Sequence, residues 1–81
     1  MKALIVEDEI LASRHLKKML DEVGNIEVVD TLESIAETID WFGSHPQPDM
    51  VFMDIHLADG IAFEIFNHVT ISCPVICTTA Y

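Results

Sequence analysis

The sequence predicts an α/β domain built on a doubly wound parallel sheet, and three short apolar runs carry this prediction. Residues 3–6, 50–53 and 75–77 are continuously apolar and contain neither Gly nor Pro. Such runs are typical of strands buried on both faces of a parallel sheet. Segments with helical spacing lie between them, and strands that alternate with helices form parallel sheets with right-handed crossovers.

The first helix and the second strand follow the first run. Residues 10–23 carry apolar side chains at helical spacing, and Gly24 is a typical residue to end such a helix. Residues 26–29 predict the second strand, and the polar Glu27 within it indicates an edge position.

A second helix opens at a capping-box pattern. Ser34 precedes Glu37 by three residues, the spacing at which the two side chains satisfy helix N–H groups. Prolines 46 and 48 end this short helix before the third strand. Its predicted inward face carries Ile35, Ile39 and Phe42.

The third helix is predicted over residues 61–69, with Phe63 and Phe66 facing inward and Ile61, Ile65 and Val69 as further candidates for that face. Asp59 and Gly60 precede it and predict a turn, with the Asp59 carboxylate capping this helix. The fourth strand follows at residues 75–77.

Composition limits the possible functions. A chain of 81 residues is long enough for one small domain, and we expect this domain to span residues 1–81. A net charge of −10 argues against direct binding to nucleic acid or to an anionic membrane surface. No apolar stretch is long enough for a membrane span or a signal peptide, so we expect a soluble cytoplasmic protein. Cys73 and Cys77 are predicted to be buried free thiols, as in a reducing compartment.

Polar residues of the kinds that take part in phosphoryl transfer follow three of the predicted strands. Glu7 and Asp8 follow the first run, Asp54 follows the second, and Thr79 lies just after the third. Parallel strands bring their C-terminal ends to one edge of the sheet, where ligands of open α/β sheets bind. Carboxylates held close together repel, so they take up a proton or bind a cation such as Mg²⁺. A carboxylate such as Asp54 can also act as the nucleophile toward a phosphoryl group.

These residues resemble a known family. Residues 4–9, 52–56 and 78–80 are similar to the three motifs of the receiver domain of bacterial two-component response regulators. The resemblance covers the whole chain. It implies a flavodoxin-like (CheY-like) sheet with strand order 2-1-3-4, without the fifth strand and the last helices, so we expect the chain to be the N-terminal part of a receiver.

The resemblance also implies a role for each site residue. Asp54 is the phosphoacceptor and Asp8 a direct Mg²⁺ ligand, whereas Glu7 holds the metal mainly through water. The backbone carbonyl of His56 completes the protein ligands, and Thr79 is the switch hydroxyl that moves toward the phosphoryl group.

Two further implications concern the neighbours of the site and the partners. The side chains of His56 and Tyr81, each two residues beyond a site residue, flank the phosphoryl group in this family. The loop at residues 55–60 is short and lacks a proline, which is similar to LytTR-type regulators. The implied partners are a sensor histidine kinase and a LytTR DNA-binding output domain, with a possible homodimer through the exposed sheet edge. The family's lysine would lie on a fifth strand beyond Tyr81.

Two other classes of function remain open from the residues alone. A small Mg²⁺-dependent phosphotransferase or phosphatase is possible on the same sheet. However, haloacid-dehalogenase-type phosphatases need a second Asp two residues after the nucleophile, where this chain has His56. The third possibility is a pseudo-receiver that binds a partner without being phosphorylated. From the resemblance to receiver domains we expect a signalling domain and not an enzyme.

Overall fold

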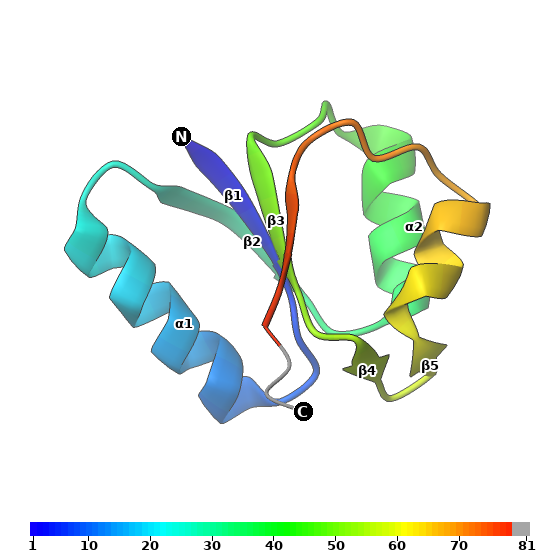
Figure 1. Ribbon diagram of the computed structural model, residues 1–81, viewed down its shortest axis with the longest axis horizontal. Coiled ribbons are helices and arrows are strands. Elements are labelled where there is room, and N and C mark those ends of the chain that lie inside the picture. The colour runs from blue at the N-terminus through cyan, green and yellow to red at the C-terminus, as the bar shows by residue number, and fades with distance from the viewer. Residues whose placement is uncertain (79–81) are drawn as a thin grey trace.

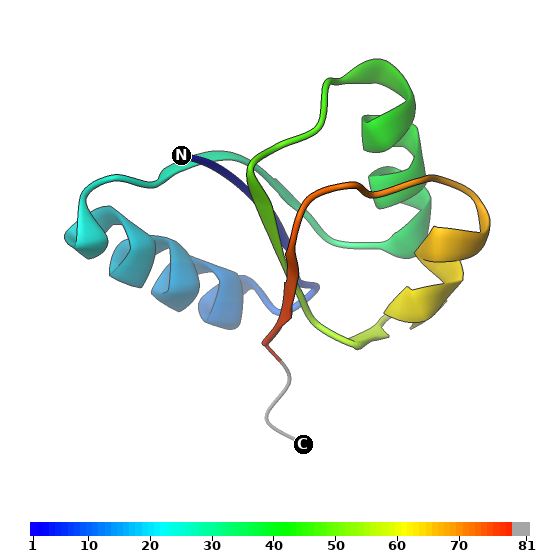
Figure 2. The same ribbon diagram turned by 45° about the horizontal axis from the view of Figure 1, so that its top comes forward.

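The computed structural model describes residues 1–78 and has three layers around a parallel sheet (Figure 1). Helix α1 (Ile10–Val23) covers one face of the sheet. Helix α2 (Ile35–Ser44) and the short 3-10 helix η1 (Ala62–Asn67) cover the other, and the turned view in Figure 2 shows the same division. Each face of the sheet therefore receives a helix, as the alternation of elements predicts.

The sheet has four parallel strands in the order β2-β1-β3-β6. The strands are β1 (Lys2–Val6), β2 (Glu27–Leu32), β3 (Met50–Met53) and β6 (Val75–Cys77). In chain order this is the predicted 2-1-3-4 arrangement, which is confirmed, as is the edge position of the second strand. Successive strands are added toward one edge up to β2 and toward the other edge from β3 onward, so the strand order reverses between β1 and β3, which is where open α/β sheets bind ligands.

The helix boundaries agree with the sequence patterns. Gly24 ends α1 with φ +100° and donates its N–H to the carbonyl of Leu20 at 3.4 Å. At the start of α2, Ser34 Oγ accepts the N–H of Glu37 at 3.0 Å, and the Glu37 carboxylate accepts the N–H of Glu33 at 2.8 Å. The capping box is therefore present, although its second bond reaches one residue further back than usual. No helix within residues 1–78 is long and apolar enough to span a bilayer.

The main core lies between the sheet and the layer of α2 and η1. Leu4 and Val6 of β1 point to this side, and Ala3 and Ile5 are buried on the side of α1, so β1 is buried on both faces. The buried members of the main core are Leu4, Val6, Leu32, Ile35, Trp41, Val51, Met53, Leu57, Ala62 and Ile65.

The predicted helix over residues 61–69 is wrong in its type, and its predicted inward face is right only for Ile65, which is fully buried, and for Val69, which packs against the core. The chain first forms a small antiparallel hairpin of β4 (His56–Leu57) and β5 (Gly60–Ile61), and the 3-10 helix η1 follows. A 3-10 helix has three residues per turn, so Ala62 and Ile65 share its buried face. Phe63 and Phe66, which were predicted to face inward, are 53% and 43% exposed.

The third apolar run was predicted to be buried on both faces, and this is also wrong. Ile76 of β6 is 44% exposed, and Cys77 is exposed. Among the described residues β6 is an edge strand, and α1 covers the side of the sheet nearer β2 (Figure 1). Both cysteines are free, but Cys73 is only partly buried, so the prediction of two buried thiols is corrected.

Candidate functional site

The ends of β1 and β3 position the acidic residues. The two strands pair in parallel with Val6 opposite Met53, so the next residues of each strand, Glu7 and Asp54, lie at the same level of the sheet. The N–H of Asp54 donates to the carbonyl of Val6 at 2.9 Å, which continues the sheet bonding beyond β3. On the other side, the N–H of Glu7 donates to the carbonyl of Leu32 at 2.8 Å. Backbone bonds of the sheet therefore fix where both side chains begin.

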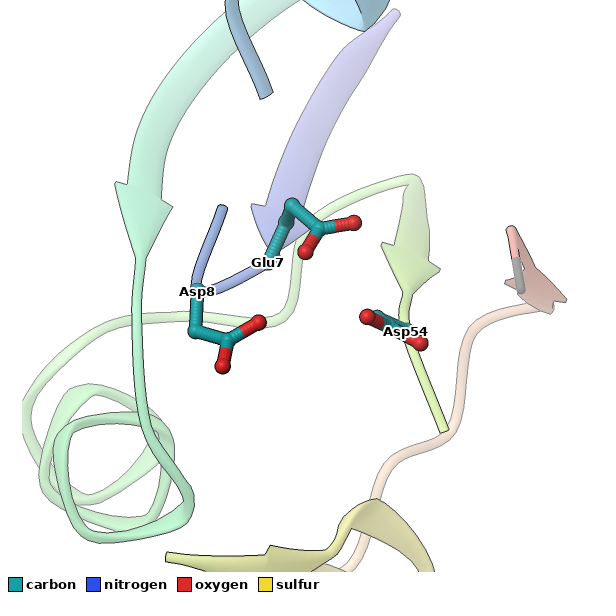
Figure 3. A group of neighbouring side chains, drawn as sticks. All are labelled: Glu7, Asp8 and Asp54. Atoms are coloured by element: carbon teal, nitrogen blue, oxygen red, sulfur yellow. The ribbon is translucent and has the colours of Figure 1, made fainter. Parts of the chain in front are cut away.

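The three predicted carboxylates come together. One carboxylate oxygen from each of Glu7, Asp8 and Asp54 lies within 4.8 Å of the others, and all three residues are half-buried. Figure 3 shows Glu7 and Asp8 extending from the end of β1, with Asp54 opposite them at the end of β3. Parallel strands without a shift in register thus suffice to build the cluster.

Burial and the neighbouring acids both act on the pKa of Glu7. Partial burial raises the pKa of Glu7 above its usual value of 4.5, because it disfavours the charged form. The charge of Asp54 and hydrogen bonds with Asp54 and Asp8, which favour a protonated Glu7, act in the same direction. The N–H of Glu9 donates to Glu7 Oε2 at 3.1 Å and opposes the shift.

The donor set fits a hard divalent cation. Mg²⁺ takes oxygen ligands in an octahedron at about 2.1 Å, so neighbouring ligand oxygens lie roughly 3 to 4 Å apart. The oxygens of Glu7, Asp8 and Asp54 are within 4.8 Å of one another, which is close to this spacing. A cation there also offsets the charge of Asp54, which adds to the effect of burial in raising the pKa of Glu7.

The loop after Asp54 holds the carboxylate of that residue. The N–H of His56 donates to Asp54 Oδ1 at 3.2 Å, and the imidazole of His56 is exposed. The N–H of Ala62 donates to the carbonyl of Ile55 at 2.7 Å and closes the base of the hairpin. His56 lies two residues beyond Asp54 and is the first residue of the hairpin.

The end of β6 approaches the same region. The N–H of Thr78 donates to the carbonyl of Met53 at 3.0 Å, next to Asp54. Thr78 also lines a hollow of about 240 Å³ with Glu7, His15 and Met19. The predicted site residues Thr79 and Tyr81 lie outside the described residues 1–78.

Asp59 has a different role from the predicted one. Its carboxylate accepts the N–H of Ile35 at 2.9 Å and the N–H of Ala36 at 3.2 Å, so it caps α2 and not the helix that follows it. No local pattern could have indicated this, because the Asp59–Ile35 bond spans 24 residues of sequence.

Comparison with known proteins agrees with this geometry. No protein-family model matches the chain. The sensory transduction protein LytT of Bacillus cereus is 34% identical over 67 residues, which are 83% of this chain and 27% of that protein. The transcriptional regulatory protein LytR of Staphylococcus aureus is 37% identical over 65 residues, which are 80% of this chain and 26% of LytR. The chain thus spans about a quarter of the length of these relatives.

Solved structures share the fold. The MaeR response regulator bound to beryllium trifluoride is 25% identical and superposes with a TM-score of 0.87, covering 100% of this chain and 68% of MaeR. The response regulator PhyR from Brucella abortus is 31% identical with a TM-score of 0.84, covering 99% of this chain and 33% of PhyR. The chain therefore belongs to the response-regulator receiver domains and is distantly homologous to LytT and LytR over most of its length.

Proposed function

We propose that this receiver domain accepts a phosphoryl group on Asp54 from a sensor histidine kinase, with Mg²⁺ as cofactor. The observation that carries the proposal is the cluster of Glu7, Asp8 and Asp54 at the paired ends of β1 and β3. A fold alone would not carry it, because one fold hosts many functions. The donor set and its place at the switch point of the sheet supply the chemistry.

The transfer step is a displacement at phosphorus. A carboxylate oxygen of Asp54 attacks the phosphorus of the donor's phosphohistidine and forms an acyl phosphate. The bond from phosphorus to the imidazole nitrogen breaks, and its electron pair goes to that nitrogen, which takes up a proton. The N–H of His56, which donates to Asp54 Oδ1 at 3.2 Å, helps to orient the carboxylate for this attack.

The remaining site residues hold charge around the phosphoryl group. Asp8 and Asp54 ligate Mg²⁺ directly, Glu7 binds it through water, and the backbone carbonyl of His56 is the last protein ligand. When bound, the metal neutralises the negative charge that develops on the transferring group. Thr79 is the switch hydroxyl that hydrogen-bonds a phosphoryl oxygen.

Phosphorylation adds negative charge to a cluster that is already crowded, and this biases the surface that partners read. We propose that a histidine kinase donates the phosphoryl group. In the full-length protein, an output domain of the LytTR type would bind DNA and respond to the phosphorylated receiver. The length of LytT and LytR beyond the aligned part leaves room for such a domain. In this proposal the receiver acts in signalling and not as an enzyme. It forms a homodimer through the edge of the sheet, and it is located in the cytoplasm.

Acetyl phosphate with Mg²⁺ tests the proposal without the kinase. The full-length protein is expected to gain one phosphoryl group, located on Asp54 by mass spectrometry of its peptides, and chelation of Mg²⁺ is expected to abolish the gain. The Asp54→Asn variant should remain unlabelled. The Asp40→Asn variant is the matched control, because Asp40 is an exposed acid on α2, and it should label like the wild type. Equal labelling of the Asp54→Asn variant contradicts the proposal.

Two further measurements separate the rival functions. Release of many equivalents of phosphate from a small phosphate ester would indicate a phosphatase or phosphotransferase. A pseudo-receiver would take up no phosphoryl group and would bind no Mg²⁺ at millimolar metal in calorimetry.

A further inference from the structure

We propose that Asp59 is a positioning residue, which clamps the loop after Asp54 to the N-terminus of α2 and so sets the backbone of His56 at the phosphoryl site. The inference rests on the proposed function, because it concerns the same site. It assigns to a residue outside the acidic cluster the task of holding the metal-binding loop in place.

The loop is a compact hairpin with few attachments. His56 pairs with Ile61 and Leu57 pairs with Gly60, so residues 58 and 59 form a two-residue turn at its tip. At the base, the N–H of Ala62 donates to the carbonyl of Ile55 at 2.7 Å. A two-stranded hairpin is only marginally stable by itself, so its position depends on contacts with the rest of the fold.

Asp59 makes the main polar contact at the tip. Its Oδ1 accepts the N–H of Ile35 at 2.9 Å and its Oδ2 accepts the N–H of Ala36 at 3.2 Å. Both carboxylate oxygens are thus used on consecutive N–H groups of the first turn of α2. These bonds, that to Ile35 first, lower the pKa of Asp59 below its usual value, as expected for a carboxylate at the positive end of a helix.

The N-terminus of α2 is incomplete without this carboxylate. A helix leaves its first N–H groups without partners inside the helix. Ser34 satisfies the N–H groups of Glu37, through its side chain, and of Thr38, through its carbonyl. Only Asp59 supplies acceptors for the N–H groups of Ile35 and Ala36 among the hydrogen bonds found in residues 1–78. The clamp therefore stabilises both partners, the helix and the hairpin.

Packing holds the tip at the same place. Gly60 has φ +143°, and a Cβ at this position would lie 3.2 Å from Cδ1 of Ile35. A larger residue would be strained at this φ, and the Ile35 side chain would have to shift by a few tenths of an ångström. Leu57 of the hairpin and Ile35 of α2 are both buried in the main core. Close contact and the two hydrogen bonds thus act at one junction.

The junction reaches the site through His56. His56 opens the hairpin, and its N–H donates to Asp54 Oδ1 at 3.2 Å. A hairpin released from α2 changes the direction of this N–H and of the neighbouring carbonyl. Side chains that orient the ligands of a metal commonly change its affinity when they are removed. Asp59 is therefore expected to affect Mg²⁺ binding without touching the metal.

The test compares Asp59→Ala and Asp59→Asn with Ser34→Ala in the full-length protein. Ser34→Ala is the matched control, because it also removes a cap from α2 but leaves the hairpin clamp in place. We expect the Kd for Mg²⁺ to rise by about 10-fold or more in Asp59→Ala. The Asn variant keeps one acceptor and should lie between Asp59→Ala and the wild type. In Ser34→Ala the Kd should stay within about twofold of the wild-type value.

Amide hydrogen exchange of the metal-free protein supplies a second measurement. The amide of Ala62, which closes the hairpin, should exchange faster in Asp59→Ala than in the wild type, relative to the amides of β1 in the same sample. In Ser34→Ala this ratio should not change.

Three outcomes decide between the alternatives. If Ser34→Ala weakens Mg²⁺ binding as much as Asp59→Ala, the effect comes from the stability of α2 alone and the inference is wrong. If the Asp59 variants change neither the Kd nor the exchange of Ala62, no clamp exists. If the wild type itself does not bind Mg²⁺, the proposed function fails and with it the role at the site, while the exchange of Ala62 still decides whether Asp59 holds the hairpin.

Discussion

The two loops that carry the acidic cluster are built in different ways. The first loop, residues 7–9, joins β1 directly to α1, and the N-cap residue Glu9 makes no hydrogen bond through its side chain to the helix. The second loop, residues 54–61, folds into a hairpin that is closed by the Ala62–Ile55 bond and held to α2 by Asp59.

This difference separates two requirements of the site. The acidic side chains need only follow the ends of two adjacent parallel strands, and sheet register places Glu7 beside Asp54. The backbone groups around Asp54 belong to a loop whose tip is bonded to α2 through Asp59. Variants that act on one loop and spare the other test whether the division is real.

The largest expected effect concerns the helix that follows the second loop. Ile65 of η1 is fully buried in the main core, and Ile65→Ala is expected to lower the free energy of unfolding by about 2–5 kcal/mol. Phe63→Ala is the control on the same helix. Since Phe63 is 53% exposed, its truncation is expected to cost about 1 kcal/mol. Urea denaturation of both variants measures the difference, and a larger loss in Phe63→Ala contradicts the assigned buried face.

A smaller loss is expected at the cap of α2. Ser34→Ala removes the acceptor of the Glu37 N–H and should lower the free energy of unfolding by about 1 kcal/mol. Ser44→Ala, at the other end of the same helix, is the control, since Ser44 is exposed and bonds only to groups of the last turn and to His45. A loss as large in Ser44→Ala as in Ser34→Ala would argue against a stabilising cap at Ser34.

A gain is expected at the first loop. Glu9→Ser gives α1 the side-chain cap that it lacks and should raise the free energy of unfolding by up to about 1 kcal/mol. Because Glu9 lies outside the cluster of Glu7, Asp8 and Asp54, the Mg²⁺ affinity of this variant should stay close to that of the wild type. A loss of stability would show that the first loop does not tolerate a cap.

The smallest effect concerns pH. Because the pKa of Glu7 is raised in the folded protein, the folded state holds this proton more tightly than the unfolded chain. The contribution of Glu7 to stability is therefore fully present below the usual pKa of 4.5 and is lost as the pH rises through the raised value. Glu7→Gln should flatten this part of the stability profile of the metal-free protein. Denaturant titrations across that pH range check it, and an identical profile in the variant contradicts it.

Protons and metal compete for the same oxygens. The affinity for Mg²⁺ should therefore fall as the pH falls through the raised pKa of Glu7, because the protonated carboxyl is a poor partner for a cation.

The sequence was informative where local rules decide the structure. The three apolar runs form strands β1, β3 and β6, the Gly24 stop ends α1, and the Ser34–Glu37 box opens α2. The positions of Glu7, Asp8 and Asp54 were also predictable, since residues that follow parallel strands meet at one edge.

The sequence was misleading where distant contacts decide. Asp59 was assigned to the helix next to it, but its partners lie 24 and 23 residues away on α2. The segment after it has apolar residues at several spacings, and the tight 3-10 turn selects Ala62 and Ile65 over the larger Phe63 and Phe66. Neither choice can be derived from spacing alone.

Calorimetric titration with Mg²⁺ tests most directly whether the two loops form one metal site. The account predicts one Mg²⁺ bound per chain by the wild type. It also predicts that Asp8→Asn, from the first loop, and Asp54→Asn, from the second, each lose most of the affinity, because each removes a direct ligand. An unchanged Kd in either variant would contradict the account, since the acids would then not share a metal.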